Sequence, residues 1–157
     1  MLRVKVIVVD RTRSSFLREG EGFYLERLRR YVKTEWVEVK PARMTRGRAE
    51  KEIVQEEGRA LIKRLGPGDT AIALDRTGRM YDSEGLSHRL ETLSRRSGGF
   101  VCFLIGGPLG LSPEVVNRAE ESFSLSRLTL THEMSRLVLL EQLYRACTIL
   151  AGEKYHK

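Results

Sequence analysis

The 157-residue sequence has few of the residues that mark disulfide-rich or metal-bound small proteins. It contains two cysteines, four prolines, one tryptophan and three histidines, and aromatic residues make up 7% of it. Cys102 and Cys147 match neither the ligand spacing of a zinc site nor a dense disulfide framework. Both lie in apolar segments, so we expect two buried free thiols.

Long hydrophobic runs are also missing, and this excludes the membrane-spanning classes. The apolar N-terminal residues are followed at once by Asp10 and several arginines, where a secretory signal would have a cleavage site. We expect a soluble, cytoplasmic protein without a membrane partner. Its length suits one compact domain over residues 1–157, because chains of this size bury about two-thirds of their unfolded surface.

The charge balance is strongly basic, with 28 Lys and Arg against 21 Asp and Glu and a pI near 9.7. The first 50 residues hold 13 basic and 7 acidic side chains. Arg43, Arg46 and Arg48 lie in the loop-like stretch "PARMTRGRAEK". Such a loop suits contacts with phosphate, and a solvated basic surface without a ligand is the alternative.

Five apolar or alternating segments predict strands, at residues 3–10, 35–40, 69–75, 99–105 and 124–130. Each strand is followed by apolar residues at helical spacing, which predict a helix. The first predicted helix contains Phe16, Tyr24 and Leu28, and the fourth contains residues 115–123. The last predicted helix runs from about residue 131 to residue 151. This alternation predicts an α/β fold with a mostly parallel five-stranded sheet and helices on both faces.

The stretch "FLIGGPLGLSPE" (103–114) leads from the fourth strand into a glycine-rich bend. Open α/β sheets bind ligands at the carboxyl ends of their strands, so this bend is a candidate site. Gly106 and Gly107 can take positive φ and let a ligand approach the backbone. Neither the dinucleotide fingerprint nor a P-loop is present, which disfavours a phosphate cradle. A tight turn without a ligand is the alternative.

The last helix is apolar on several sides, because residues 137–140 read "LVLL". Consecutive helical residues point in directions that spread over most of a turn. We therefore predict a homodimer through this helix. Burial within its own domain is the alternative.

Three stretches together, "LIGGPLGLSPEV", "SLSRLTLTHEMSRLVLLEQLYRA" and the terminal "KYHK", resemble the RlmH family over essentially the whole chain. These are SPOUT-class enzymes that methylate N3 of a pseudouridine in 23S ribosomal RNA. The resemblance implies a trefoil knot in the C-terminal half, a homodimer and S-adenosylmethionine as methyl donor. Matched position by position, it assigns the cofactor site to Leu74, Gly106, Gly107, Ser126, Arg127, Leu128, Thr129, Leu130 and Thr131.

Methyl transfer to nitrogen needs no metal, and an imide nitrogen must lose its proton before it attacks. His132 directly follows the cofactor run and is the candidate base. We expect catalytic roles for His132, Arg145, Tyr155 and His156, the last two in a C-terminal tail that in this family reaches the partner subunit's cofactor. The expected RNA contacts are Arg136, Arg145, Tyr155, His156 and Lys157.

Two positions depart from the family pattern. Thr131 stands where relatives commonly have proline before the histidine, and Leu109 stands where many have a polar or acidic residue. Two alternatives remain: a SPOUT enzyme that acts on another RNA such as tRNA, and a ribosome-binding relative without catalytic activity.

Overall fold

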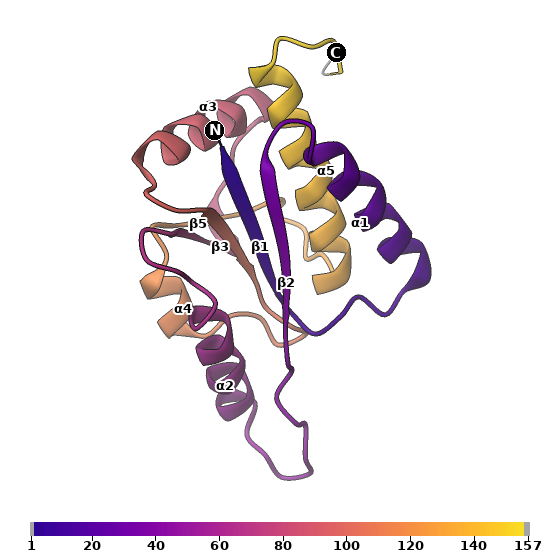
Figure 1. Cartoon of the computed structure of the whole chain (residues 1–157). Coiled ribbons are helices and arrows are strands. Elements are labelled where there is room, and N and C mark those ends of the chain that lie inside the picture. Colours follow the sequence, from indigo (N-terminus) through magenta and orange to yellow (C-terminus); the bar gives the residue numbers. More distant parts are fainter. Residues whose placement is uncertain (1, 156–157) are drawn as a thin grey trace.

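The computed structural model describes residues 2–155 and contains one five-stranded sheet in the order β2-β1-β4-β3-β5 (Figure 1). All four neighbouring pairs are parallel. The predicted α/β class with a parallel sheet is confirmed. The strands are β1 (Arg3–Val9), β2 (Lys33–Val39), β3 (Thr70–Arg79), β4 (Val101–Ile105) and β5 (Glu121–Phe123).

Helices cover both faces of the sheet, as predicted (Figure 1). Alternating side chains divide the strands between two hydrophobic cores: Val4, Val6 and Val8 of β1 face one side, and Ile7 and Val9 face the other. On the first side lie α1 (Ser15–Leu28), α3 (Ser83–Arg96) and α5 (His132–Leu150), and on the second lie α2 (Glu50–Ile62) and α4 (Pro113–Arg118).

Helix α5 packs against both α1 and α3. Seven of its residues are buried within the chain: Arg136, Leu139, Leu140, Leu143, Ala146, Cys147 and Thr148. Packing within the chain therefore covers much of the wide apolar surface from which we predicted a dimer. Apolar side chains are exposed instead on α1, where Phe16 is 67% and Phe23 47% accessible. Phe16, which the helical pattern grouped with Tyr24 and Leu28, is thus exposed, whereas Leu28 is buried.

The predictions around the fifth strand are also wrong. Helix α4 ends at Arg118, and residues 121–123 form the strand, whereas residues 124–130 form a loop. The chain leaves the helix early because it pairs with β3, beginning with a hydrogen bond from Glu120 N to the Ala71 carbonyl (2.8 Å). In the loop, serine hydroxyls bond to nearby backbone groups and so replace a strand ladder.

The remaining structural expectations concern the cysteines and the membrane. Cys102 and Cys147 are free and buried, as predicted. No helix within residues 2–155 is both long enough and apolar enough to span a bilayer.

Candidate functional site

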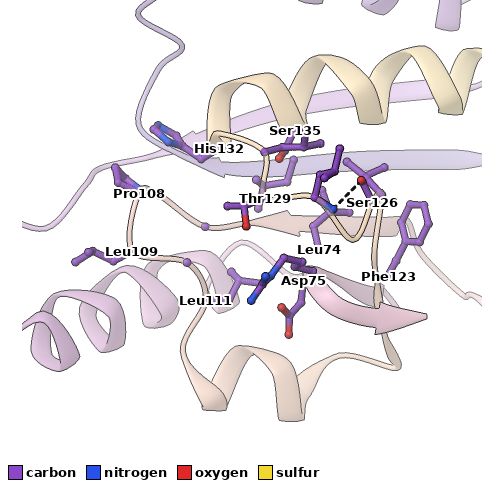
Figure 2. A pocket seen from close by; sticks show the side chains of 18 residues that line it. Leu74, Asp75, Pro108, Leu109, Leu111, Phe123, Ser126, Thr129, His132 and Ser135 are labelled. Atoms are coloured by element: carbon purple, nitrogen blue, oxygen red, sulfur yellow. Dashed lines mark hydrogen bonds between the residues drawn. The ribbon is translucent and has the colours of Figure 1, made fainter. Parts of the chain in front are cut away.

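A cavity of about 360 Å³ lies at the carboxyl end of β4, beside the part of β3 that follows its pairing with β4. Three separate segments line it: the middle of β3 at Leu74, just after its pairing with β4 ends, the bend after β4, and the loop 124–130 (Figure 2). The resemblance to the RlmH family implied that these segments form one site, and the structure brings them together. The predicted cofactor residues that line the cavity are Leu74, Gly106, Gly107, Ser126, Leu128, Thr129 and Leu130.

The bend is closed on itself by contacts that require glycine. Gly110 N donates to the Gly107 carbonyl (3.0 Å), and Gly110 has a φ of 81°. A Cβ on Gly106 would lie 2.5 Å from the Gly110 carbonyl carbon, so a side chain there would force the bend open. The residue with positive φ is thus Gly110, and the expectation of positive φ at Gly106 and Gly107 is wrong. Gly106 instead permits close backbone approach.

The opposite wall is the loop 124–130, which is held by its own hydrogen bonds. The Ser124 hydroxyl donates to the Ser126 carbonyl (2.9 Å), and Leu128 N donates to the Ser126 hydroxyl (3.0 Å). Leu128 is 76% exposed although it lines the cavity. An apolar ring bound in the cavity would cover this leucine and so gain hydrophobic contact.

Two members of the predicted cofactor run do not line the cavity. Arg127 is exposed, and Thr131 is the N-cap of α5. The Thr131 hydroxyl accepts a hydrogen bond from Met134 N (3.2 Å), which satisfies one of the free amides at the helix start. Thr131 therefore fixes where α5 begins, and so where His132 lies.

His132 is the first residue of α5 and lies at the edge of the cavity (Figure 2). Burial lowers its pKa, and the positive charge of Arg136 lowers it further, whereas Glu133 opposes the shift. The lowered pKa keeps the imidazole neutral at pH 7, and a neutral imidazole can accept a proton.

Sequence reasoning missed three polar residues of the cavity, Asp75, Arg76 and Ser135. Asp75 directly follows Leu74, and its carboxylate accepts hydrogen bonds from the Thr77 amide (3.3 Å) and hydroxyl (3.0 Å). A carboxylate near the carboxyl end of a strand is the signal that could have identified it, because such groups bind ribose hydroxyls in many α/β folds.

Arg136 was predicted to contact RNA, and this prediction is wrong because its side chain has no exposed surface. Its guanidinium donates to the Val9 carbonyl (2.5 Å) and to the Thr12 hydroxyl (2.9 Å). Arg136 is therefore a structural link between α5 and the end of β1.

Arg145 and Tyr155 lie far from the cavity of their own chain. Thirteen residues separate Arg145 from His132 along α5, which corresponds to about 20 Å. Tyr155 folds back on the helix, with its ring 4.7 Å from that of Tyr144 and its hydroxyl 3.2 Å from Glu141 Oε1. The Arg145 guanidinium lies 4.9 Å from the Tyr155 ring. His156 and Lys157 lie outside the described residues.

Comparison with known proteins identifies the family. A family model described as "Predicted SPOUT methyltransferase" matches residues 2–156. The chain belongs to the SPOUT methyltransferase family. It is 50% identical to the ribosomal RNA large subunit methyltransferase H of Rubrobacter xylanophilus, with 98% of each chain covered. Proteins of the same name from Anaeromyxobacter sp. and Desulfotalea psychrophila are 46% and 40% identical, each over 99% of this chain and 100% of the relative.

The resemblance found in the sequence is thereby confirmed, and the chain is a methyltransferase. The trefoil knot that this family implies stays a prediction. The cavity suits a nucleoside donor of methyl groups, because leucines form its walls while Asp75 and Ser126 supply polar contacts. Within residues 2–155, no three His, Cys, Asp or Glu side chains gather as metal ligands would.

Proposed function

We propose that this SPOUT methyltransferase methylates N3 of a pseudouridine in the 23S rRNA of the large ribosomal subunit, with S-adenosylmethionine as donor. One observation carries the proposal: Leu74, the glycine bend and the loop 124–130 enclose a single cavity with His132 at its edge. The names of relatives that match over almost the full chain support large-subunit rRNA as the substrate. The net charge of +7 suits a polyanionic partner. The proposed location is the cytoplasm, where bacterial ribosomes work.

Different residues of the cavity would bind different parts of the donor. Leu74, Leu128 and Leu130 would hold the adenine ring between apolar side chains, and Asp75 would accept hydrogen bonds from the ribose. When bound, S-adenosylmethionine supplies an electrophilic methyl group: the N3–CH3 bond forms as the S–CH3 bond breaks, and sulfur keeps the electron pair. His132 accepts the N3 proton in its neutral form.

We further propose that the active enzyme is a homodimer. Arg145 lies about 20 Å along α5 from His132, and Tyr155 packs on Tyr144, about 18 Å along the same helix from His132, so their proposed roles require the cavity of a partner subunit. The exposed Phe16 and Phe23 of α1 supply apolar surface for such contact. In the dimer, Arg145, Tyr155, His156 and Lys157 of one subunit would meet the rRNA at the cavity of the other.

The test is mass-spectrometric mapping of 23S rRNA from a strain that lacks this protein. We expect one pseudouridine to lose its N3-methyl group and to regain it when the gene is restored. An unchanged methylation pattern would contradict the proposal. Calorimetry with S-adenosylmethionine and with S-adenosylhomocysteine separates the alternatives, because a ribosome-binding relative without activity would bind neither.

A further inference from the structure

A second cavity, of about 310 Å³, opens beside the first at the carboxyl ends of β1 and β2. Pro108 and His132 line both cavities and so form the wall between them. The proposed base therefore stands between the proposed donor site and a separate space. A methyl acceptor must lie on this boundary to reach both the donor and His132.

The second cavity contains one buried acceptor without a partner. Glu57 of α2 is 3% exposed, and its Oε2 accepts a hydrogen bond from Ala42 N (3.1 Å). Its Oε1 is buried and has no hydrogen-bond partner among residues 2–155. Burial raises the pKa of Glu57, and the bond from Ala42 only partly offsets this. An unpaired carboxylate oxygen of this kind is costly unless a ligand supplies a donor.

The glycine bend lies directly against this oxygen. A Cβ on Gly107 would lie 3.3 Å from Glu57 Oε1 and 3.5 Å from Val9 Cγ1. A side chain at position 107 would therefore press on the carboxylate. This contact connects the bend of the donor cavity directly to the acceptor in the second cavity.

The other two carboxylates of the second cavity already have partners. Asp10 accepts hydrogen bonds from the Arg13 guanidinium, at 2.9 and 3.2 Å. Glu133 accepts from the backbone amides of Arg13 (3.2 Å) and Ser14 (3.1 Å). Glu57 is thus the acceptor that remains for a ligand.

The walls and the mouth of this cavity suit a nucleotide. Pro41, Met44 and Pro108 give apolar surface against which a flat ring can pack. The loop that supplies Pro41 and Met44 also carries Arg43 and Arg46, both of which are exposed. Two exposed guanidinium groups are therefore carried by the same loop that lines the cavity, and exposed guanidinium groups suit contacts with the phosphates of a nucleic acid.

We propose that the second cavity receives the target base and that Glu57 selects pseudouridine over uridine by accepting a hydrogen bond from N1–H. In pseudouridine the sugar is attached at C5, so N1 keeps a hydrogen; in uridine the corresponding ring position is a C–H. N1 and N3 flank the same carbonyl, so a base whose N1–H meets Glu57 can turn N3 toward His132. This inference rests on the proposed function and adds the residue that determines its specificity.

The test compares methyl transfer to large ribosomal subunits reconstituted with pseudouridine, 1-methylpseudouridine or uridine at the target position. The wild-type protein should prefer pseudouridine to uridine by about tenfold or more in kcat/KM, as expected for one buried hydrogen bond. The subunits with 1-methylpseudouridine should react no faster than those with uridine. This comparison uses the unaltered protein and so does not depend on how a variant folds.

Glu57→Gln is the matching variant of the protein. Its amide has one acceptor oxygen, whereas Ala42 N and the base N1–H each require one. We expect the preference for pseudouridine over uridine, measured as the ratio of kcat/KM on the two substrates, to shrink at least fivefold. Glu50→Gln, on the exposed start of the same helix, is the control and should keep the preference.

The outcomes separate the two proposals. Absence of transfer to all three substrates by the wild-type protein would overturn both the proposed function and this inference. Transfer to pseudouridine with equal rates on 1-methylpseudouridine would overturn this inference alone. A Glu57→Gln protein that folds normally and keeps the wild-type preference would also overturn this inference and leave the proposed function intact.

Discussion

Arg136 Nη2 donates a hydrogen bond to the Val9 carbonyl oxygen at 2.5 Å and so joins the first third of α5 to the end of β1. Its Nη1 bonds to the Thr12 hydroxyl (2.9 Å), which in turn donates to the Glu21 carboxylate of α1. These buried hydrogen bonds connect α5, the end of β1 and α1. They therefore fix the position of His132, which lies one helical turn before Arg136.

Replacing this arginine should cost stability. In Arg136→Met the Val9 carbonyl and the Thr12 hydroxyl lose their donor in a buried site, and Glu21 loses the opposite charge that stabilises its ionised form. We expect a loss of about 3 kcal/mol in the free energy of unfolding. Urea denaturation followed by circular dichroism measures it.

The matched control is Arg127→Met, because Arg127 is exposed. Its free energy of unfolding should stay within about 0.5 kcal/mol of the wild type. Equal stability of the two variants would show that the buried link of Arg136 contributes nothing.

Gly106→Ala tests the geometry of the bend. The new Cβ would lie 2.5 Å from the backbone of Gly110, so the bend must open and the wall of the donor cavity must shift. We expect the affinity for S-adenosylhomocysteine to fall at least tenfold, or about 1.4 kcal/mol, in titration calorimetry.

Gly22→Ala is the control for the bend. A Cβ there meets nothing within 4 Å, and alanine favours the helix. This variant should bind like the wild type and be slightly more stable. If Gly106→Ala also bound normally, the bend would not shape the donor site.

Much of the fold follows from local patterns, because short β-branched or apolar runs such as "VKVIVV" and "VCFLI" are typical of central parallel strands. The loop 124–130 was misread because its apolar residues alternate, while Ser124 and Ser126 bind the backbone locally. Arg136 was misread because its partners, Val9 and Thr12, are more than 120 residues away. Glu57 gave no signal, since a glutamate in "VQEEGRAL" reads as an exposed helical residue.

The pH dependence of methyl transfer tests the role of His132. Burial and then Arg136 lower its pKa below the usual 6.5, so the neutral base is lost only when the pH falls through that lowered value. The rate should therefore stay insensitive to His132 down to pH 6.5 and decline below it. In His132→Asn the rate should drop by about 10²-fold, and the acid decline should disappear.

His88→Asn is the control for this experiment, because His88 is exposed on α3. Its pH profile should match that of the wild type. A decline of unchanged shape in His132→Asn would assign the proton acceptor to another group.

Mixing two inactive variants tests whether each site takes its tail from a partner subunit. His132→Ala removes the proposed base at the cavity. Tyr155→Ala alters the tail, because the Tyr155 ring packs on Tyr144, about 18 Å along α5 from His132. If the tail acts across the dimer, a mixed dimer combines the intact cavity of one variant with the intact tail of the other.

Random exchange of subunits makes half of the dimers mixed, and each mixed dimer has one intact site of two. About a quarter of wild-type activity should therefore return. If the tail acts within its own chain, every site in the mixture carries one defect. No recovery after exchange, verified by mass spectrometry of the mixed dimer, would therefore contradict the shared site.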